Sequence, residues 1–146
     1  IKPSAAAAPA AVAFDFPTYR RHYVAQQQQM EDRIAPLRER LRRVLALQSP
    51  ELARLAALDA VTERLLGEPE RRLLASLPTL LEKRFAKLRA EAEAAEHATS
   101  DAAPPWQPHF QQELDGLLQA ELDLRWQPIA GLLAALPAPG PSDPLS

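Results

Sequence analysis

Few side chains in this sequence are suited to catalysis or metal binding, and they lack the spacing that such chemistry needs. The chain has no cysteine and only three histidines, His22, His97 and His109. None of the three follows a glutamate by three residues, which is the spacing that di-metal helical bundles use. Thiolate ligands for zinc are excluded as well. We therefore expect solvated histidines, no metal site and no disulfide.

The motifs of common enzyme classes are also missing. The chain contains four glycines, and they form neither the Gly-x-Ser-x-Gly turn of a serine hydrolase nor a glycine-rich loop that binds phosphate. The carboxylates are numerous, but they are scattered over helical segments in the way that hydrated helices require. We therefore expect no enzymatic activity and no cofactor.

The arginines of the first predicted helix are the best candidates for binding a charged partner. Arg33, Arg40 and Arg43 lie on one side of a helix, and clustered cations on one face are what phosphate binding needs. Asp32 and Glu39 interrupt the edges of this stripe. Two interpretations stay open: a surface that binds nucleic acid or an anionic membrane, or a face that is solvated or paired within the chain.

Aromatic side chains near helix ends are candidates for interface anchors, because exposed aromatics contribute much of the energy of binding. For the set as a whole we favour core packing, which is the alternative role. We include Tyr19 and Tyr23, with the three arginines, in a candidate interaction surface. The other aromatics of the set are Phe16, Trp106, Phe110 and Trp126.

Two aspartates stand in the interior of predicted helices, where aspartate is a poor helix former. Asp59 and Asp123 are each flanked by leucine or alanine. An ion pair with an arginine of a neighbouring helix would explain both positions, and we predict such a pair for each.

The elements that must position these residues are helices with apolar seams. Apolar side chains recur at steps of four and three, which is typical of a coiled coil. Such a seam needs a partner helix, and several seams let the chain supply its own partners. They are Met30, Ile34, Leu37, Leu41 and Val44; Leu52, Leu55, Leu58, Val61 and Leu65; Leu74, Leu77, Leu81, Phe85 and Leu88; and Leu118, Leu122, Ile129, Leu132 and Leu136.

Capping residues and prolines set the boundaries of the first helix and the start of the second. We expect the first helix over about residues 17–48, with Asp15 and a proline at its start and a kink near Arg33 that Pro36 causes. Ser49 and Pro50 then begin a second helix. A hairpin turn and a bent continuous helix are both compatible with this signal, and we favour the hairpin.

Glycine and proline also punctuate the second half of the chain. The segment Gly67-Glu68-Pro69 predicts a break. A third segment then continues to about residue 98, with Pro78 as another kink, and a loop follows. The last helix is expected over about residues 108–136, kinked or loosened at residues 115–116 and at Pro128.

Charge is distributed unevenly between the first and last helices. Residues 17–48 carry seven basic and three acidic side chains, and residues 106–136 carry one basic and four acidic side chains. Opposite flanking charges favour neighbouring positions in a bundle. The longest uncharged run, residues 126–142, contains four prolines and falls short of the roughly 20 apolar residues that span a bilayer. We therefore expect no membrane span and, by default, a cytoplasmic location.

Four parts of the sequence carry a resemblance to known proteins: residues 16–23, Ser49-Pro50 with residues 55–61, residues 80–85, and residues 120–125 with Pro128 and residues 131–133. Together they resemble an uncharacterised family of bacterial proteins, found mainly in beta- and gammaproteobacteria and known as a domain of unknown function. The resemblance implies a longer parent protein, which agrees with a start that looks like a linker. It also implies neighbouring genes for membrane proteins similar to motor stators and peptidoglycan-binding proteins, but no activity or site residues.

The sequence therefore predicts an all-α fold, an antiparallel bundle of three long helices with coiled-coil packing and a middle helix that is broken in two. We expect an Ala/Pro-rich linker without order over residues 1–14, the bundle over residues 15–136 and a Pro-rich tail without order over residues 137–146. The favoured function is a non-catalytic interaction or scaffold module that self-associates or binds a protein partner, in an envelope complex by analogy. Binding of nucleic acid or an anionic membrane through the arginines of the first helix is the alternative.

Overall fold

The computed structural model describes residues 2–5, 15–98 and 105–138, and within these ranges it is built from helices without any strand. The helices are α1 (Phe16–Ala46), α2 (Pro50–Leu74), α3 (Leu77–Ala98) and α4 (Gln107–Ala135). The prediction of an all-α bundle is thereby confirmed. The rest of the predicted linker, loop and tail, residues 1, 6–14, 99–104 and 139–146, lies outside the described residues.

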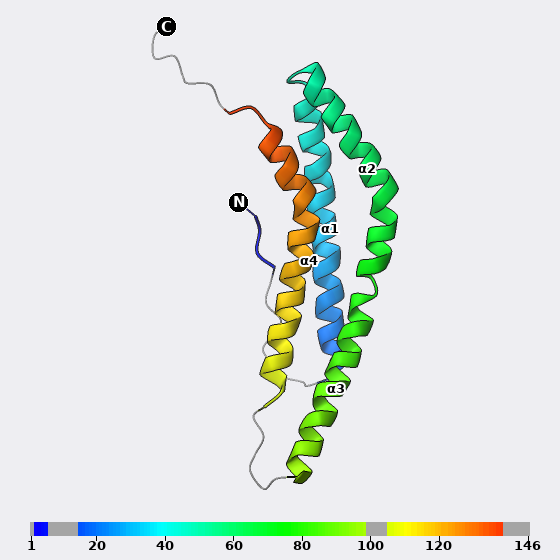
Figure 1. Cartoon of the computed structure of the whole chain (residues 1–146), viewed down its shortest axis with the longest axis vertical. Helices are drawn as coiled ribbons and strands as arrows, with labels where there is room; N and C mark the ends of the chain where they lie inside the picture. Colours follow the sequence, from blue (N-terminus) through cyan, green and yellow to red (C-terminus); the bar gives the residue numbers. More distant parts are fainter. Residues whose placement is uncertain (1, 6–14, 99–104, 139–146) are drawn as a thin grey trace, which may run out of the picture.

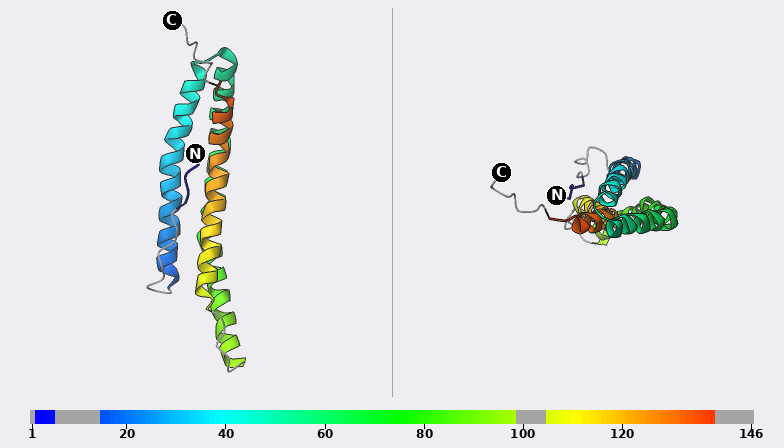
Figure 2. Two further views of the ribbon diagram at one scale, coloured as in Figure 1. Left: turned by 90° about the vertical axis from the view of Figure 1, so that its left-hand side faces the viewer. Right: turned by 90° about the horizontal axis from the view of Figure 1, so that it is seen from above.

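The helices form an elongated bundle. In Figure 1, α1 rises along the molecule, α2 and α3 descend as one bent rod, and α4 rises again. Seen end-on in Figure 2, α1, α4 and the α2–α3 rod occupy three corners of a triangle. The α2–α3 rod is thus the middle helix that the sequence predicted to be broken. None of the described helices is long and apolar enough to cross a membrane.

The first helix begins and ends close to its predicted bounds. Asp15 occupies the N-cap position in an extended conformation, but its carboxylate makes no capping bond to the backbone. It accepts a hydrogen bond from the Thr18 hydroxyl instead, at 2.5 Å. Pro36 lies inside α1, and the helix continues through it to Ala46.

The turn between α1 and α2 confirms the predicted hairpin. The Ser49 hydroxyl accepts a hydrogen bond from the backbone N–H of Leu52 at 3.1 Å, and Pro50 is the first helical residue. Both residues suit the first turn of a helix, where backbone N–H groups have no partner within the helix. The Ser49 hydroxyl accepts a hydrogen bond from one of these groups, and Pro50 has no N–H that needs a partner. The chain reverses direction there, as Figure 1 shows.

The predicted break at Gly67 is wrong, and the break between α2 and α3 lies at Ala75 and Ser76 instead. A glycine commonly ends a helix by adopting a positive φ, and no described glycine does so. Pro78 explains the observed position, because it lacks the N–H that would bond to the Leu74 carbonyl. Pro78 falls in the first turn of α3, where this loss is tolerated.

The bundle has two hydrophobic cores, one in each half. The aromatic core joins the first part of α1 to α3 and to the first part of α4, and Phe85 lies at its centre. The aliphatic core joins the last part of α1 to α2 and to the last part of α4. The aromatic core contains Phe16, Tyr19, Tyr23, Met30, Leu81, Phe85, Leu88, Phe110, Leu114, Leu118 and Leu122, and the aliphatic core contains Leu41, Leu45, Ala56, Ile129 and Leu132.

Three of the four predicted seams face these cores, with one local shift. In α1 the seam passes from Leu41 to Leu45, which is fully buried, while the predicted Val44 is 38% exposed. The step after Leu41 is thus four residues and not three. The seam of α2 behaves differently, because four of its five predicted residues are exposed.

Candidate functional site

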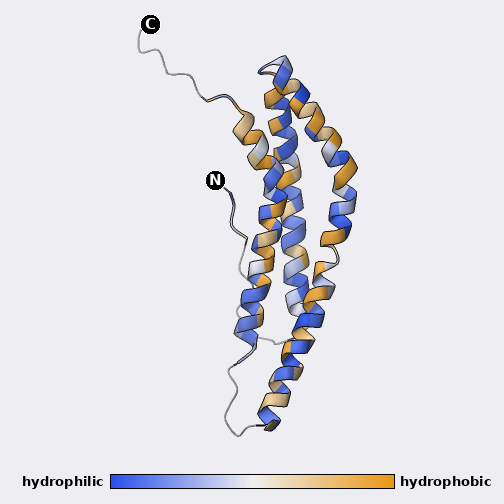
Figure 3. Ribbon diagram, in the orientation of Figure 1, coloured by the Kyte–Doolittle hydropathy of each residue, from blue (hydrophilic) through white to orange (hydrophobic). Residues whose placement is uncertain are grey.

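The outer side of α2 exposes several large apolar side chains. Leu58 and Leu65 are 63% and 65% exposed, and Leu66 is 57% exposed. Only Ala56 and Leu74 are buried in the whole helix. Figure 3 shows the corresponding apolar segments along α2. A helix with an apolar stripe normally buries that stripe, so this surface is a candidate binding site.

A groove lies between this face and the last part of α4. It has a volume of about 270 Å³. Leu132 is buried at its base, and Gly131 leaves the α4 side open because no atom lies within 4 Å of where its Cβ would be. We call this feature the α2/α4 groove. It is lined by Leu55, Leu58, Asp59, Thr62, Pro128, Gly131 and Leu132.

Ion pairs hold the opposite side of α2 against α1. Arg38 donates two hydrogen bonds to the Asp59 carboxylate, at 2.9 and 2.8 Å, and Arg42 donates one at 3.0 Å. Both arginines also pair with Glu63 at 3.0 Å. Burial raises the pKa of Asp59, but the two arginines outweigh that effect and hold it below its usual value. The predicted arginine pair of Asp59 is therefore confirmed.

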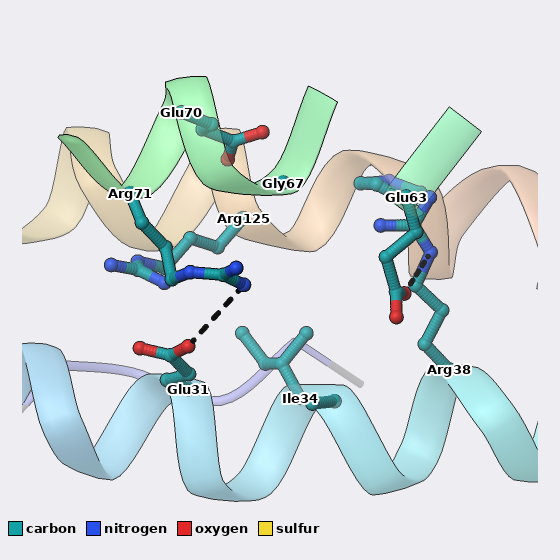
Figure 4. Close-up of a pocket in the computed structure, with 10 residues that line it drawn as sticks. Glu31, Ile34, Arg38, Glu63, Gly67, Glu70, Arg71 and Arg125 are labelled. Carbon is teal, nitrogen blue, oxygen red and sulfur yellow. Dashed lines mark ion pairs between the residues drawn. The ribbon is translucent and has the colours of Figure 1, made fainter. Parts of the chain in front are cut away.

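A small charged cavity lies between α1, α2 and α4 (Figure 4). Three carboxylates and three guanidinium groups line it, and the Arg71–Glu31 pair spans it at 3.7 Å. Its volume of about 100 Å³ is well below the roughly 300–1,000 Å³ of small-molecule sites. Because the charges balance, the cavity favours neither an anion nor a cation. The charged residues are Glu31, Glu63, Glu70, Arg38, Arg71 and Arg125.

A buried carboxylate joins the two halves of the bundle. The side chain of Glu121 is 0% exposed, and it accepts hydrogen bonds from the Tyr23 hydroxyl at 3.2 Å, Gln27 at 2.7 Å and Arg125 at 3.2 Å. The Gln27 amide also donates to the Leu74 carbonyl at 3.0 Å, which is the group that Pro78 leaves free. Burial, together with the adjacent Glu121 carboxylate, raises the pKa of Tyr23. The network thus ties α1 and α4 to the bend between α2 and α3.

The five residues of the candidate interaction surface do not lie together in the fold, because the three arginines are exposed and the two tyrosines are buried. Arg33, Arg40 and Arg43 are exposed on α1, and Arg43 pairs with Glu39 at 2.9 Å. Tyr19 and Tyr23 are only 2% and 0% exposed, because they continue the α1 seam into the aromatic core. Burial raises the pKa of Tyr19 as well. The two tyrosines therefore leave the candidate interaction surface, and only the arginines remain on it.

The histidines lie apart from one another along the bundle. His109 is exposed and lies 3.0 Å from the Glu113 carboxylate, which also binds Arg84 at 2.7 Å. His97 is exposed near the end of α3. His22 is half-buried, and its Nε2 has no hydrogen-bond partner among the residues that the structure describes. Within the same ranges, no three side chains of the types His, Cys, Asp or Glu gather closely enough to hold a metal ion.

The prediction for Asp123 is wrong, since its partner is not an arginine of a neighbouring helix. The carboxylate pairs with Lys2 of the N-terminal segment and accepts a hydrogen bond from Gln119 at 3.2 Å. These contacts lower the pKa of Asp123. The half-buried arginines of α1 pair with α2, while α1 and α4 are neighbours, as their opposite charges predicted.

Two features described above, the exposed α2 leucines and the buried Glu121, were missed by the sequence interpretation. The α2 leucines had the spacing of a core seam, so their exposure could not be read from periodicity alone. Glu121 was missed because a single glutamate inside an amphipathic helix resembles any hydrated one. The available signal was its position four residues after Leu117 and three after Leu118, which places it on the buried side of α4.

Comparisons with known proteins identify a family but no function. A family model with the description "Protein of unknown function (DUF3348)" matches residues 1–138. No curated protein and no solved structure matches the chain.

Proposed function

Because the chain belongs to this family of unknown function, we propose its role from the surface itself: a non-catalytic interaction module that binds a helix of a protein partner along the outer side of α2. The observation that carries this proposal is the exposure of Leu58, Leu65 and Leu66, at 57% to 65%. Removing apolar area from water stabilises a complex by about 25 cal/mol per Å². The α2 face therefore offers a driving force for association that the isolated bundle does not use.

The shape of the α2/α4 groove supports a helical partner. Two helices that diverge leave a channel into which a third helix fits, and small residues allow its backbone to approach closely. Gly131 provides such a place on α4, with open space where a Cβ would lie. Leu58 provides the apolar wall on α2.

The charged side chains support a non-catalytic role. Asp59, Glu113 and Glu121 each accept hydrogen bonds from an arginine within the chain. A carboxylate that is occupied in this way is a poor general base, because its lone pairs are already engaged in hydrogen bonds. We also propose that this interaction role is carried out in the cytoplasm of a proteobacterium. In this proposal the chain is the C-terminal part of a longer protein that serves an envelope complex.

Site-specific photo-cross-linking in the native organism tests the proposal. A photoreactive amino acid replaces Leu58 in the full chain, and the matched control carries it at Leu80, which is 53% exposed on α3. We expect a defined protein adduct from position 58 that is lost when Leu65→Glu is added, and no such adduct from position 80. Equal adducts from both positions, or none from position 58, would contradict the proposal.

Binding of nucleic acid or an anionic membrane through Arg33, Arg40 and Arg43 is a second candidate, favoured by their exposure on one helix. The Arg43–Glu39 ion pair argues against this candidate, because one of the three cations already has a carboxylate partner. The test is binding of DNA and of anionic vesicles at low salt, because phosphate contacts are strongest there. Binding that disappears when all three arginines become glutamate supports this candidate, and absence of binding at low salt eliminates it.

A further inference from the structure

The exposed residues of α2 follow an ordered arrangement of charge. Two columns of residues spaced by seven run along its outer side, and every member is exposed. A spacing of seven keeps residues on one side of a helix, with the slight drift that left-handed supercoiled helix pairs accommodate. The first column is Glu51, Leu58, Leu65 and Arg72, and the second is Arg54, Val61 and Glu68.

Each column is complementary to itself when its direction is reversed. The first begins with an acid, has two leucines in the middle and ends with a base. The second begins with a base, has valine in the middle and ends with an acid. Reversal therefore exchanges opposite charges at the ends and keeps apolar residues at the centre, which is the condition for an isologous twofold contact.

We propose that the partner on this face is a second copy of the same chain, with the two α2 helices antiparallel and a twofold axis beside Val61. Arg54 lies seven residues before Val61 and Glu68 lies seven after it, so Arg54 of one copy faces Glu68 of the other across the axis. Leu58 lies three residues before Val61 and Leu65 lies four after it. Leu58 of one copy therefore meets Leu65 of the other between the charged pairs. This inference rests on the proposed docking role of α2, and it identifies the occupant.

Glu51 and Arg72 form the outer pair of the same arrangement, at ten residues before and eleven after Val61. A parallel pairing would instead place Arg54 against Arg54 and Glu51 against Glu51. Like charges in direct contact are unfavourable, so the charge order selects the antiparallel dimer.

The charges at the column ends are exposed, and two of the four, Glu68 and Arg72, take part in ion pairs within α2. Glu51 and Arg54 form no ion pair with any other residue in the described ranges. Glu68 pairs with Arg71 at 3.1 Å and with Arg72 at 3.7 Å, and these side chains are 50% to 79% exposed. Exposed pairs within one helix are weak, so Glu68 and Arg72 can exchange them for partners on the second copy.

Sedimentation equilibrium of the full chain tests the dimer. We expect a concentration-dependent dimer that is weakened at least roughly 100-fold by Leu58→Glu, because a charge then replaces an apolar centre on both copies. Arg54→Glu should weaken it roughly tenfold, since the pair occurs twice in a symmetric dimer. The double change Arg54→Glu with Glu68→Arg should restore most of the loss. Thermal melts confirm that each variant still folds.

Cysteine cross-linking tests the direction of the helices, and the chain has no native cysteine to interfere. With Val61→Cys, a short bismaleimide should link the two copies, because both thiols lie at the axis. With Ala75→Cys the thiols of an antiparallel pair are about 40 Å apart along the helices, and no link should form. Efficient linking at both positions indicates a parallel pair and overturns the proposed arrangement.

The two proposals fail in different ways. A chain that stays monomeric at every concentration, or a dimer that Leu58→Glu leaves intact, overturns self-association through α2. If photo-cross-linking from Leu58 then gives an adduct with another protein, the docking role of α2 stands and only its occupant changes. If position 58 gives no adduct at all, both proposals are wrong.

Discussion

The two halves of the bundle are closed by different means. Around Phe85, aromatic rings pack edge to face, with centroids 4.9 Å from Trp106 and 5.1 Å from Phe110, and apolar residues of three helices surround them. In the other half, α2 is held to α1 mainly by the ion pairs of Arg38 and Arg42 and by the small side chain of Ala56. The apolar side of α2 faces outward in the same half.

The difference indicates a division of tasks along the bundle. The aromatic half buries most of its seam residues, with Ile34 and Leu77 partly buried at the edge of the core. The α2 half keeps its shape through charged contacts on the inner side, so its leucines stay available on the outer side. Glu121 lies between the halves and bonds to Tyr23 and Arg125, so we expect a change at Glu121 to affect both halves.

The largest expected effect comes from the aromatic half. Phe85→Ala should lower the free energy of unfolding by about 3–5 kcal/mol, because it removes a buried ring that contacts four other aromatics and leaves a cavity. The matched change Leu58→Ala in α2 should alter it by less than about 0.5 kcal/mol, since that side chain is exposed. Urea unfolding of dilute protein measures both. Similar losses for the two variants would contradict the comparison.

The next largest effect is expected at the junction. Glu121→Gln should lower the free energy of unfolding by about 2–3 kcal/mol, because Arg125, 12% exposed, loses its buried counter-ion while it stays out of water. The control is Glu113→Gln on the same helix, where the carboxylate is 32% exposed and the solvent can replace part of the interaction.

Equilibrium unfolding and native-state hydrogen exchange distinguish the junction from an ordinary core position. Glu121→Gln should increase amide exchange in both halves, including the end of α2 near Leu74. Exchange that rises only within α4 would show that Glu121 does not connect the two halves.

The sequence was sufficient for those features of the fold that depend on local chemistry. The Ser49-Pro50 start, the ends of α1 and α4 and the buried seam from Leu74 to Leu88 follow from capping, proline and periodicity, and the structure confirms them. The break near Gly67 could not be predicted correctly, because Pro78 and the Gln27 contact with the Leu74 carbonyl place it elsewhere. That contact joins residues that are 47 positions apart.

The candidate site was predictable only in part. The exposed arginines of α1 could be read from the helical pattern, whereas Tyr19 and Tyr23 are buried by contacts with α3 and α4 that the pattern does not contain. The α2 leucines show the converse case, because the pattern predicted a core seam and these side chains are exposed. A seam at steps of three and four indicates which residues lie together, but a packed partner decides whether they are buried.

A smaller, pH-dependent effect is expected in the α2 half. Asp59→Asn should lower the free energy of unfolding by about 1–2 kcal/mol at pH 7, because it removes the carboxylate that holds Arg38 and Arg42. The folded pKa of Asp59 lies below its unfolded value. Its stabilisation is therefore complete above the unfolded pKa and disappears as the pH falls through the folded pKa.

Urea unfolding of both proteins at a series of pH values checks this expectation. The difference between wild type and Asp59→Asn should be constant near neutrality and should shrink below about pH 4. A difference that is unchanged in strong acid would mean that Asp59 contributes through packing and not through its charge.

The smallest effects separate stability from association. Gly131→Ala and Gly116→Ala each place a methyl group where no atom lies within 4 Å of the Cβ position, so both should raise the free energy of unfolding by about 0.5–1 kcal/mol through helix propensity. Gly131 lines the α2/α4 groove, whereas Gly116 is exposed in the aromatic half. Only Gly131→Ala should also weaken the dimer in sedimentation, because its methyl group occupies space that an approaching helix needs. A dimer that is equally strong in both variants would limit the contact to α2 itself and exclude the floor of the groove.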